Sequence, residues 1–324
     1  MSHSKKFGFA QAAKRLGLSL KPYASIKGSS PERRSVYRIS DGQRELFTLG
    51  ATILSTSFIG MKIAADKATT NEILRHHGIP TTEQLIVSSL PELEAFYNKH
   101  QGDVLMKPLG STLGRGVHAS IQTIEEARNA FKTIQKEFQY VVIEKKIRGK
   151  EYRILIFENQ IIAAAEFIPP TLTGNGSDTI LLLINQHNNS IIPGSNTVPI
   201  PIKPELVRIL NEQGLAFSMI PEPGETINLY RAAPISHGGH AVDVTDRIHP
   251  INVELFLAAT RAIHLNIAGI DVITEDINLP LIKTGGVIIE INGGPDLSLH
   301  QGSIKRPYFD PAEQILRQYF GLQT

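Results

Sequence analysis

The residues best suited to chemistry fall in a stretch that runs from an apolar strand into a glycine-rich loop. Residues 104–106 are apolar, and the loop behind them carries Lys107, Ser111, Gly114, Arg115 and Gly116. Glycines let a backbone approach an anion closely and point successive N–H groups at it. The lysine and the arginine add fixed positive charge at the base and the tip of the loop. This pattern indicates a site for the phosphates of a nucleoside triphosphate.

Two familiar phosphate motifs do not fit this stretch. A Walker A loop has its lysine after the glycines and opens a helix, whereas here Lys107 precedes them and a strand is expected at 116–120. A dinucleotide fingerprint also needs a helix directly after its glycines. The alternative that remains open is a glycine-rich hairpin with surface charges.

A second set of chemistry-bearing residues lies on two apolar strands near the C-terminus. Asp271 follows Gly269 and Ile270 on one strand, and Glu290 and Asn292 flank an isoleucine on the other. Because side chains alternate along a strand, Glu290 and Asn292 are expected on one face. Buried carboxylates are costly without a cation, and Mg²⁺ prefers oxygen ligands. The set predicts a Mg²⁺ site, with a capped strand end carrying surface carboxylates as the alternative.

A third stretch joins two strands through a basic linker. Glu144 ends the strand expected at 140–144, and Glu151 opens the strand expected at 151–158. The backbone of such a linker can read an adenine edge, and an acid can accept hydrogen bonds from ribose hydroxyls. Solvated surface charge is the alternative interpretation.

The elements that must position these residues mix helices and strands, which predicts an α+β chain. Hydrophobic periodicity and capping signals favour helices at 6–17, 59–77, 91–100, 123–138, 177–187, 203–213, 253–264 and 311–319. Further strands are expected at 35–40, 43–49, 84–88, 160–168, 226–230, 269–273 and 287–291, and loops at 171–175 and 236–240. The predicted domains are a small N-terminal α+β region, 1–62, and a larger domain, 63–324, that contains a lobe at about 85–145.

Composition excludes several classes of protein. The 324 residues are 41% hydrophobic, which is enough for a sizeable core and more than one lobe. The 33 basic and 31 acidic residues give a net charge of +2, so nucleic acid and anionic membranes are not expected partners. The absence of cysteine excludes disulfides, thiolate zinc sites and a cysteine nucleophile. No apolar run has the length of a membrane span or signal peptide, and a cytoplasmic protein is expected.

Taken together and in order, the motifs resemble the ATP-grasp superfamily, in particular the ATP-grasp half of cyanophycin synthetase and of bifunctional glutathione-forming ligases. The resemblance covers the chain from about Gln43 onward. It is carried by residues 57–69, 107–108, 114–117, 151–155, 174–180, 213–214, 221–224, 243–246, 268–271 and 290–292.

The resemblance implies a fold of two α/β lobes that clasp ATP, here preceded by the small N-terminal unit. It also implies roles for individual residues. Lys67 and Lys107 would contact the phosphates. The adenine and ribose contacts would come from Glu144, Lys145, Ile147 and Glu151. Mg²⁺, or Mn²⁺ in its place, would bind to Asp271, Glu290 and Asn292. Arg231 would neutralise the transferring phosphoryl group together with Lys107 and Arg115. The implied activity is an ATP- and Mg²⁺-dependent carboxylate–amine ligase acting through an acyl phosphate on amino-acid or short peptide substrates.

Departures from the family pattern lie where the substrate should bind. The segment 231–239 is one residue shorter than expected, lacks an asparagine and has His237 in place of threonine, and Asp296 replaces a glycine. His237, Gly238, Gly239 and His300 are therefore the candidate substrate residues. His237 and His240 could also be a metal pair or simple loop residues. An ATP-binding protein without ligase activity and a small-molecule kinase remain alternatives, and the small N-terminal unit is compatible with a homodimer.

Overall fold

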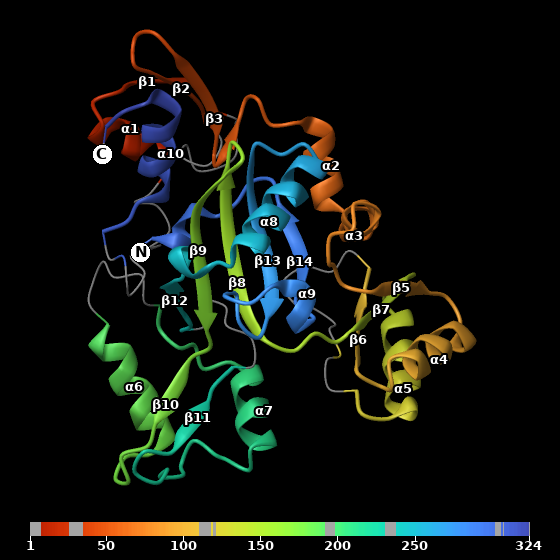
Figure 1. Ribbon diagram of the computed structural model, residues 1–324. Helices are drawn as coiled ribbons and strands as arrows, with labels where there is room; N and C mark the ends of the chain where they lie inside the picture. Colours follow the sequence, from red (N-terminus) through yellow and green to blue (C-terminus); the bar gives the residue numbers. More distant parts are fainter. Residues whose placement is uncertain are drawn as a thin grey trace.

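The structure is a computed structural model that describes residues 8–25, 35–109, 118, 121–191, 198–230, 238–301, 306 and 308–323 (Figure 1). Its helices are α1 (Phe9–Arg15), α2 (Phe58–Ala65), α3 (Lys67–His76), α4 (Leu90–Lys99), α5 (Ile124–Gln135), α6 (Ile180–Ser190), α7 (Pro204–Glu212), α8 (Pro250–Ala262), α9 (Leu281–Thr284) and α10 (Pro311–Phe320), with 3-10 turns η2 (Thr245–Arg247) and η3 (Leu297–His300). Its strands are β1 (Ser19–Ser25), β2 (Ser35–Ser40), β3 (Glu45–Leu49), β4 (Thr52–Ile53), β5 (Gln84–Val87), β6 (Val104–Pro108), β7 (Val141–Lys145), β8 (Lys150–Phe157), β9 (Gln160–Ile168), β10 (Thr171–Thr173), β11 (Thr226–Asn228), β12 (His240–Asp243), β13 (Ile267–Thr274) and β14 (Val287–Asn292). No helix in these ranges is both long and apolar enough to cross a bilayer.

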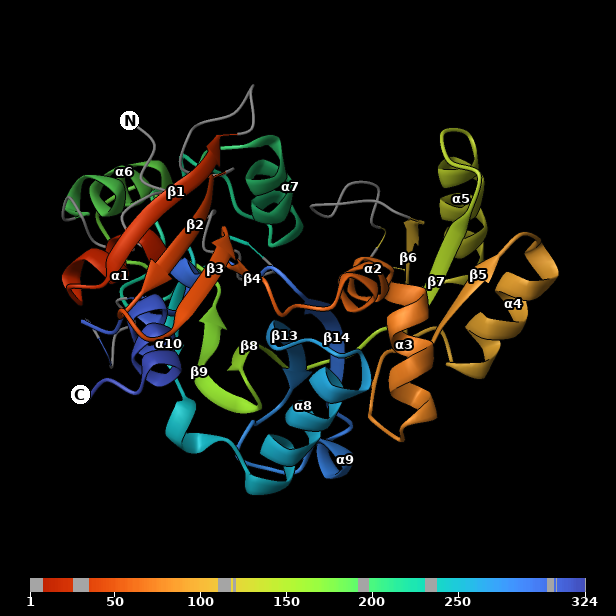
Figure 2. The ribbon, with the colours of Figure 1, turned by 90° about the horizontal axis from the view of Figure 1, so that it is seen from above.

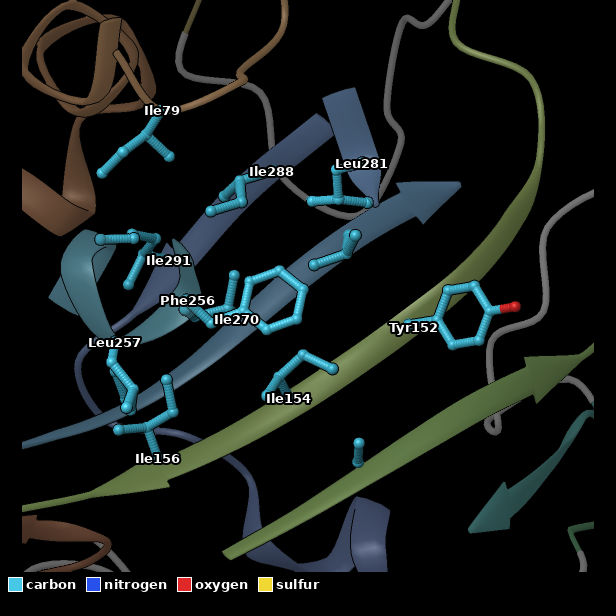
Figure 3. Packing of buried hydrophobic residues seen from close by; sticks show 14 of the residues in the cluster. Ile79, Tyr152, Ile154, Ile156, Phe256, Leu257, Ile270, Leu281, Ile288 and Ile291 are labelled. Carbon is cyan, nitrogen blue, oxygen red and sulfur yellow. The ribbon is translucent and has the colours of Figure 1, made fainter. Parts of the chain in front are cut away.

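A five-stranded antiparallel sheet with the order β12-β9-β8-β13-β14 forms the centre of the molecule. One of its faces packs against α8, and Figure 3 shows Phe256 and Leu257 from that helix among isoleucines of the strands, including Ile154, Ile270 and Ile288. These side chains are almost fully buried. Because burying each isoleucine contributes about 2 kcal/mol, this packing fixes which face of the sheet remains for polar side chains.

The N-terminal sheet, with the order β1-β2-β3-β4, shares a core with the opposite face of the central sheet. Leu155 and Phe157 of β8 belong to the same cluster as Ile39 and Leu46 of the N-terminal sheet and Leu316 of α10. Figures 1 and 2 both place this sheet beside α1 and α10, at one end of the central strands. This core covers one end of that face of the central sheet, so the other end of the same face is available for other contacts.

A separate lobe, which we call the lid, consists of a three-stranded sheet with the order β5-β7-β6 and helices α4 and α5. It has its own core, which includes Phe96, Phe131 and Ile143, and capping boxes begin both helices. The lid lies beside the β14 edge of the central sheet (Figures 1 and 2). Two chain segments connect it to that sheet, since Thr81 bridges Ile288 and the linker after β7 leads into β8.

A fourth cluster contains the short ribbon β10–β11 and helices α6 and α7. Its apolar residues include Ile184, Leu206 and Ile227. In Figure 1, α7 and the lid both lie toward the same end of the central strands, and in Figure 2 α7 lies over the side of the sheet opposite α8 while the lid lies beyond the β14 edge. The polar end of the central sheet is therefore flanked by both.

The predicted elements are largely confirmed, with three corrections. The helix expected at 59–77 is two helices, because Asp66 is extended and its carboxylate accepts hydrogen bonds from the N–H groups of Ala68 and Thr69. The loop expected at 171–175 contains β10, which finds its partner only in the distant β11. The strands β1, β4 and β12 were not predicted, and each pairs with another part of the chain. The domain boundaries remain predictions.

Candidate active site

A row of side chains crosses the central sheet on the face opposite α8. Neighbouring strands place Asp243, Ala165, Arg153, Asp271 and Glu290 as successive Cα partners, from β12 to β14. Cross-strand partners share a face of the sheet and lie within contact distance of one another. The row thus assembles three acids and one arginine from strands that are far apart in the sequence.

Ion pairs balance the acidic end of this row. Arg153 pairs with Asp271, and the Nζ of Lys67 lies 2.7 Å from Glu290 Oε2. Asn292 lies on the same face as Glu290 and donates from Nδ2 to Asp271 Oδ2 at 3.3 Å. The structure therefore brings together the three predicted metal ligands and one predicted phosphate lysine. Arg153 joins them and was not among the predicted site residues.

Burial makes the negative charge at this position costly. Desolvation raises the pKa of Asp271 to about 6, although the Arg153 charge opposes the shift. A carboxylate in such surroundings is stabilised by additional positive charge. Within the described ranges no group of three His, Cys, Asp or Glu is placed to hold a metal ion. The candidate ligand set is instead two carboxylates completed by the amide oxygen of Asn292.

His300 is buried close to the same site. Its side chain is almost completely inaccessible, and its Nδ1 has no hydrogen-bond partner among the described residues. Burial lowers the pKa of His300 to about 3, and the nearby Arg153 charge adds to this shift. The imidazole is therefore neutral at physiological pH and can act as a hydrogen-bonding group near Arg153 without adding charge.

The lid carries a second ion pair, between Lys107 of β6 and Glu144 of β7. Both side chains are mostly buried, at 19% and 11% exposed. Met106 and Ile143, which face the other way, pack into the core beneath the lid helices. Lys107 and Glu144 therefore lie on the face of the lid sheet that α4 and α5 do not cover.

The linker from the lid to β8 runs close to the central sheet. The N–H of Lys145 donates to Glu83 O and the N–H of Lys146 to Asp103 O, whereas within the described chain the Ile147 N–H meets no backbone acceptor. Gly149 has a φ of +140°, and a Cβ there would lie 2.5 Å from the carbonyl carbon of Thr274. Only glycine allows this approach. Glu151 follows on β8, two residues from Arg153 and on the same face.

Several predicted residues lie outside the described ranges, namely Ser111, Gly114, Arg115, Gly116, Arg231 and His237. Gly238 and Gly239 are described and buried. A Cβ on Gly238 would lie 2.5 Å from the Cγ1 of Ile200, and its φ of +90° suits glycine. His240 is the first residue of β12 rather than part of a loop.

Arg153 could have been found from the sequence. Glu151 and Arg153 are two residues apart at the start of a predicted strand, so strand periodicity places both on one face. What the sequence alone does not give is the register that sets Arg153 opposite Asp271.

At the far end of the row Arg306 Nη1 lies 3.4 Å from Asp243 Oδ2, a pair that joins segments 63 residues apart.

Comparisons with known proteins decide the fold. Residues 65–167 match the family described as phosphoribosylglycinamide synthetase, ATP-grasp (A) domain. The bifunctional glutathione synthetase from Pasteurella multocida superposes with a TM-score of 0.71 at 21% identity, over 97% of this chain and 43% of that one. The chain has the ATP-grasp fold. The predicted fold and the resemblance to ATP-grasp proteins are confirmed.

Two curated relatives agree with this assignment. Cyanophycin synthetase from Trichormus variabilis is 33% identical over 250 residues, 76% of this chain and 28% of the relative. The glutathione biosynthesis bifunctional protein GshAB from Clostridium perfringens is 29% identical over 292 residues, 87% of this chain and 37% of the relative. The ATP-grasp chain thus spans about a third of the length of these relatives.

Proposed function

We propose that this chain is an ATP- and Mg²⁺-dependent carboxylate–amine ligase that forms an amide bond through an acyl phosphate. One observation carries the proposal: Asp271, Glu290 and Asn292 meet Arg153 and Lys67 on a single face of the central sheet. Two carboxylates, an amide and two cations form a balanced set that Mg²⁺ and phosphate groups can enter together. The Lys107–Glu144 pair supplies a second polar surface on the lid, which lies beside the β14 edge of the central sheet (Figures 1 and 2).

ATP is proposed to lie between the lid and the central sheet. Lys107 and the loop containing Ser111, Gly114 and Gly116 would hold the phosphates from the lid, and Lys67 would hold them from α3. Glu144 and the backbone of Lys145 and Ile147 would contact adenine, and Glu151 the ribose. The Ile147 N–H, which meets no backbone acceptor among the described residues, and the close approach of Gly149 to β13 support this placement.

The oxygen atoms of Asp271, Glu290 and Asn292 fit a hard cation such as Mg²⁺. Bound there, Mg²⁺ would supply positive charge beside the phosphates that react. Arg153 and Lys67, which now balance the two carboxylates, would then be available to phosphate oxygens. The paired cations are what allow the acidic face to exist before nucleotide binds, because buried carboxylates without a partner are costly.

The chemistry follows in two steps. A substrate carboxylate oxygen attacks the γ-phosphorus, the bond to ADP breaks and an acyl phosphate forms. An amine then attacks the acyl carbon, phosphate leaves and the amine loses a proton. The chain's task is to position the reactants and neutralise charge, for which Lys107, Arg115 and Arg231 are the proposed cations.

The proposed substrates are amino acids or short peptides, in keeping with the names of the curated relatives. His300, Gly238 and Gly239, with His237, would line the substrate site. The neutral buried His300 offers an uncharged hydrogen-bonding group beside Arg153. We further propose that the enzyme works in the cytoplasm, as its lack of cysteine allows.

The test is ADP release when pairs of amino acids or dipeptides are supplied with ATP and Mg²⁺, with mass spectrometry of the products. Wild type should release ADP for at least one pair and form the amide. Glu290→Ala and Asn292→Ala should each lower the rate at least 100-fold while the fold is kept. Glu254→Ala, an exposed residue of α8, is the matched control and should retain full turnover. Full turnover in both site variants would overturn the metal assignment.

A further inference from the structure

A hollow of about 350 Å³ opens beside α7, where the β10–β11 ribbon joins the central sheet. It is lined by Pro169, Ile209, Glu212, Gln213, Asn228 and Tyr230. Within the described part of the chain, no basic side chain is among these residues. Ligand pockets in proteins have volumes of about 300–1,000 Å³, so the hollow is large enough for one side chain of a substrate.

Three observations place the hollow beside the proposed active site. The N–H of Leu229 donates to Pro170 O at 3.1 Å, so this wall of the hollow lies where the ribbon meets the end of β9. Helix α7 lies over the side of the central sheet opposite α8 (Figure 2), which is also the side of the acidic face. Tyr230 directly precedes Arg231, one of the proposed catalytic cations. A substrate of the proposed ligase would therefore react close to the hollow.

Hydrogen bonds determine what the lining can offer a ligand. The side-chain amide of Gln213 donates from Nε2 to Ile209 O at 3.0 Å and to Asn228 O at 2.8 Å. Both amide hydrogens are used in this way, and Oε1 is the acceptor end of the group. The phenol of Tyr230 donates to Pro201 O at 2.7 Å. The lining thus combines hydrogen-bond acceptors with an aromatic ring.

Three features of the lining favour a positively charged group. Glu212 supplies a carboxylate. The hollow lies at the C-terminal end of α7, where the helix dipole is negative and where the last turn of the helix carries no basic residue. The ring of Tyr230 offers a face that attracts cations. An ammonium or guanidinium group matches all three features, whereas a carboxylate matches none of them.

A cation of the chain itself already contacts this carboxylate. Arg208, one turn earlier on α7, donates from Nη1 to Glu212 Oε1 at 2.7 Å. The Arg208 side chain is 57% exposed, and an exposed pair at this spacing contributes little to stability. A bound cation would therefore compete with Arg208 for Glu212, and removal of Arg208 should strengthen the binding of such a ligand.

We propose that the hollow is a subsite for a basic side chain of the substrate, an amino acid or peptide residue that ends in an ammonium or guanidinium group. Glu212 and the C-terminal end of α7 would hold the charge, and the ring of Tyr230 would lie against it. The apolar surfaces of Pro169 and Ile209 would contact the aliphatic part of the side chain. This inference rests on the proposed ligase function, because it assigns a side-chain preference to that reaction.

Calorimetric titration of the 324-residue chain with free amino acids tests the subsite without turnover. L-arginine and L-lysine should bind, and their uncharged counterparts L-citrulline and L-norleucine should bind at least tenfold more weakly. Glu212→Gln should weaken the binding of arginine and lysine at least tenfold, and Arg208→Ala should strengthen it at least twofold. Glu254→Gln, at an exposed residue of α8, is the matched control and should bind like wild type. Circular dichroism confirms that each variant is folded.

Turnover provides an independent measurement. For substrates that release ADP, Glu212→Gln should lower kcat/KM at least tenfold for a lysine-containing substrate and leave it unchanged for the norleucine counterpart. Equal binding of arginine and citrulline, no binding of any of the four amino acids, or an unchanged affinity in Glu212→Gln would overturn the subsite and leave the ligase function standing. Selective binding of arginine and lysine by a chain that releases no ADP would support the subsite and contradict the ligase function.

Discussion

At the residue scale, charge balance explains how an acidic face can exist within a buried sheet. Each carboxylate at its centre has a cation from another element, Arg153 from β8 and Lys67 from α3. The lid repeats the arrangement with Lys107 and Glu144. Removing one member of a largely buried pair leaves the other charge uncompensated, which is strongly destabilising.

Substitutions in the Lys107–Glu144 pair of the lid should change the free energy of unfolding and the affinity for ATP independently. Lys107→Met should lower the free energy of unfolding by about 2 kcal/mol, because Glu144 then remains buried without its cation. The double variant Lys107→Met with Glu144→Gln should regain most of that stability but still bind ATP more weakly than wild type. Urea denaturation and calorimetric titration with ATP measure the two effects. Equal ATP affinity in the double variant and wild type would remove Lys107 from the nucleotide site.

The buried His300 predicts how the free energy of unfolding depends on pH. The folded state keeps the imidazole neutral down to a pKa of about 3, whereas the unfolded chain protonates near 6.5. Stability from this residue is therefore complete above pH 6.5 and is lost as pH falls toward 3, by about 1.4 kcal/mol per pH unit. His300→Gln cannot be protonated, so the stability difference between wild type and this variant should shift by about 1 kcal/mol per unit between pH 6 and pH 4. A pH-independent difference would show that His300 is not buried as described.

At the element scale, the break between α2 and α3 positions Lys67. Asp66 ends one helix, caps the next and makes Lys67 the first residue of α3. The sequence predicted one continuous helix here, because the apolar periodicity runs through the break and a single aspartate is a weak local signal. The cap depends on the extended backbone of Asp66, which the helical periodicity of the sequence does not indicate.

Replacing this cap tests its contribution. Asp66→Ala should lower the free energy of unfolding by about 1 kcal/mol, the usual cost of losing a side-chain cap, and should weaken ATP binding because Lys67 loses its fixed position. Asp66→Asn keeps an acceptor at the same place and should stay close to wild type in thermal unfolding. If alanine and asparagine behave alike, the cap has no part in holding α3.

Whether a feature could be predicted from the sequence depends on how far apart along the chain the interacting residues lie. The long strands β8, β9, β13 and β14 were predicted because their apolar runs are local signals, and Glu290 and Asn292 were placed on one face by strand period alone. The short strands β10 and β12 were missed because each is defined by a partner strand far along the chain. The pairing of Arg153 with Asp271 depends on register, which no local pattern encodes.

At the scale of the whole molecule, the lid has a core of its own and reaches the central sheet through two connections. A lobe of this kind can move about its connections without disturbing either core. Bound ATP should therefore slow amide hydrogen exchange in the linker 146–149 and in β6, which face the proposed nucleotide, more than in α4. Exchange mass spectrometry with and without ATP measures this. Uniform slowing across the lid would argue against a nucleotide on its open face.

The most direct measurement of the central claim is trapping of the proposed acyl phosphate with hydroxylamine. In the presence of ATP, Mg²⁺ and amino-acid or dipeptide carboxylates, wild type should form a hydroxamate in step with ADP, and Glu290→Ala should form neither. ADP without hydroxamate would point to phosphoryl transfer onto another group, and bound ATP with no ADP for any substrate would show a nucleotide-binding protein without ligase activity. Either result would contradict the assignment of this site to amide-bond formation.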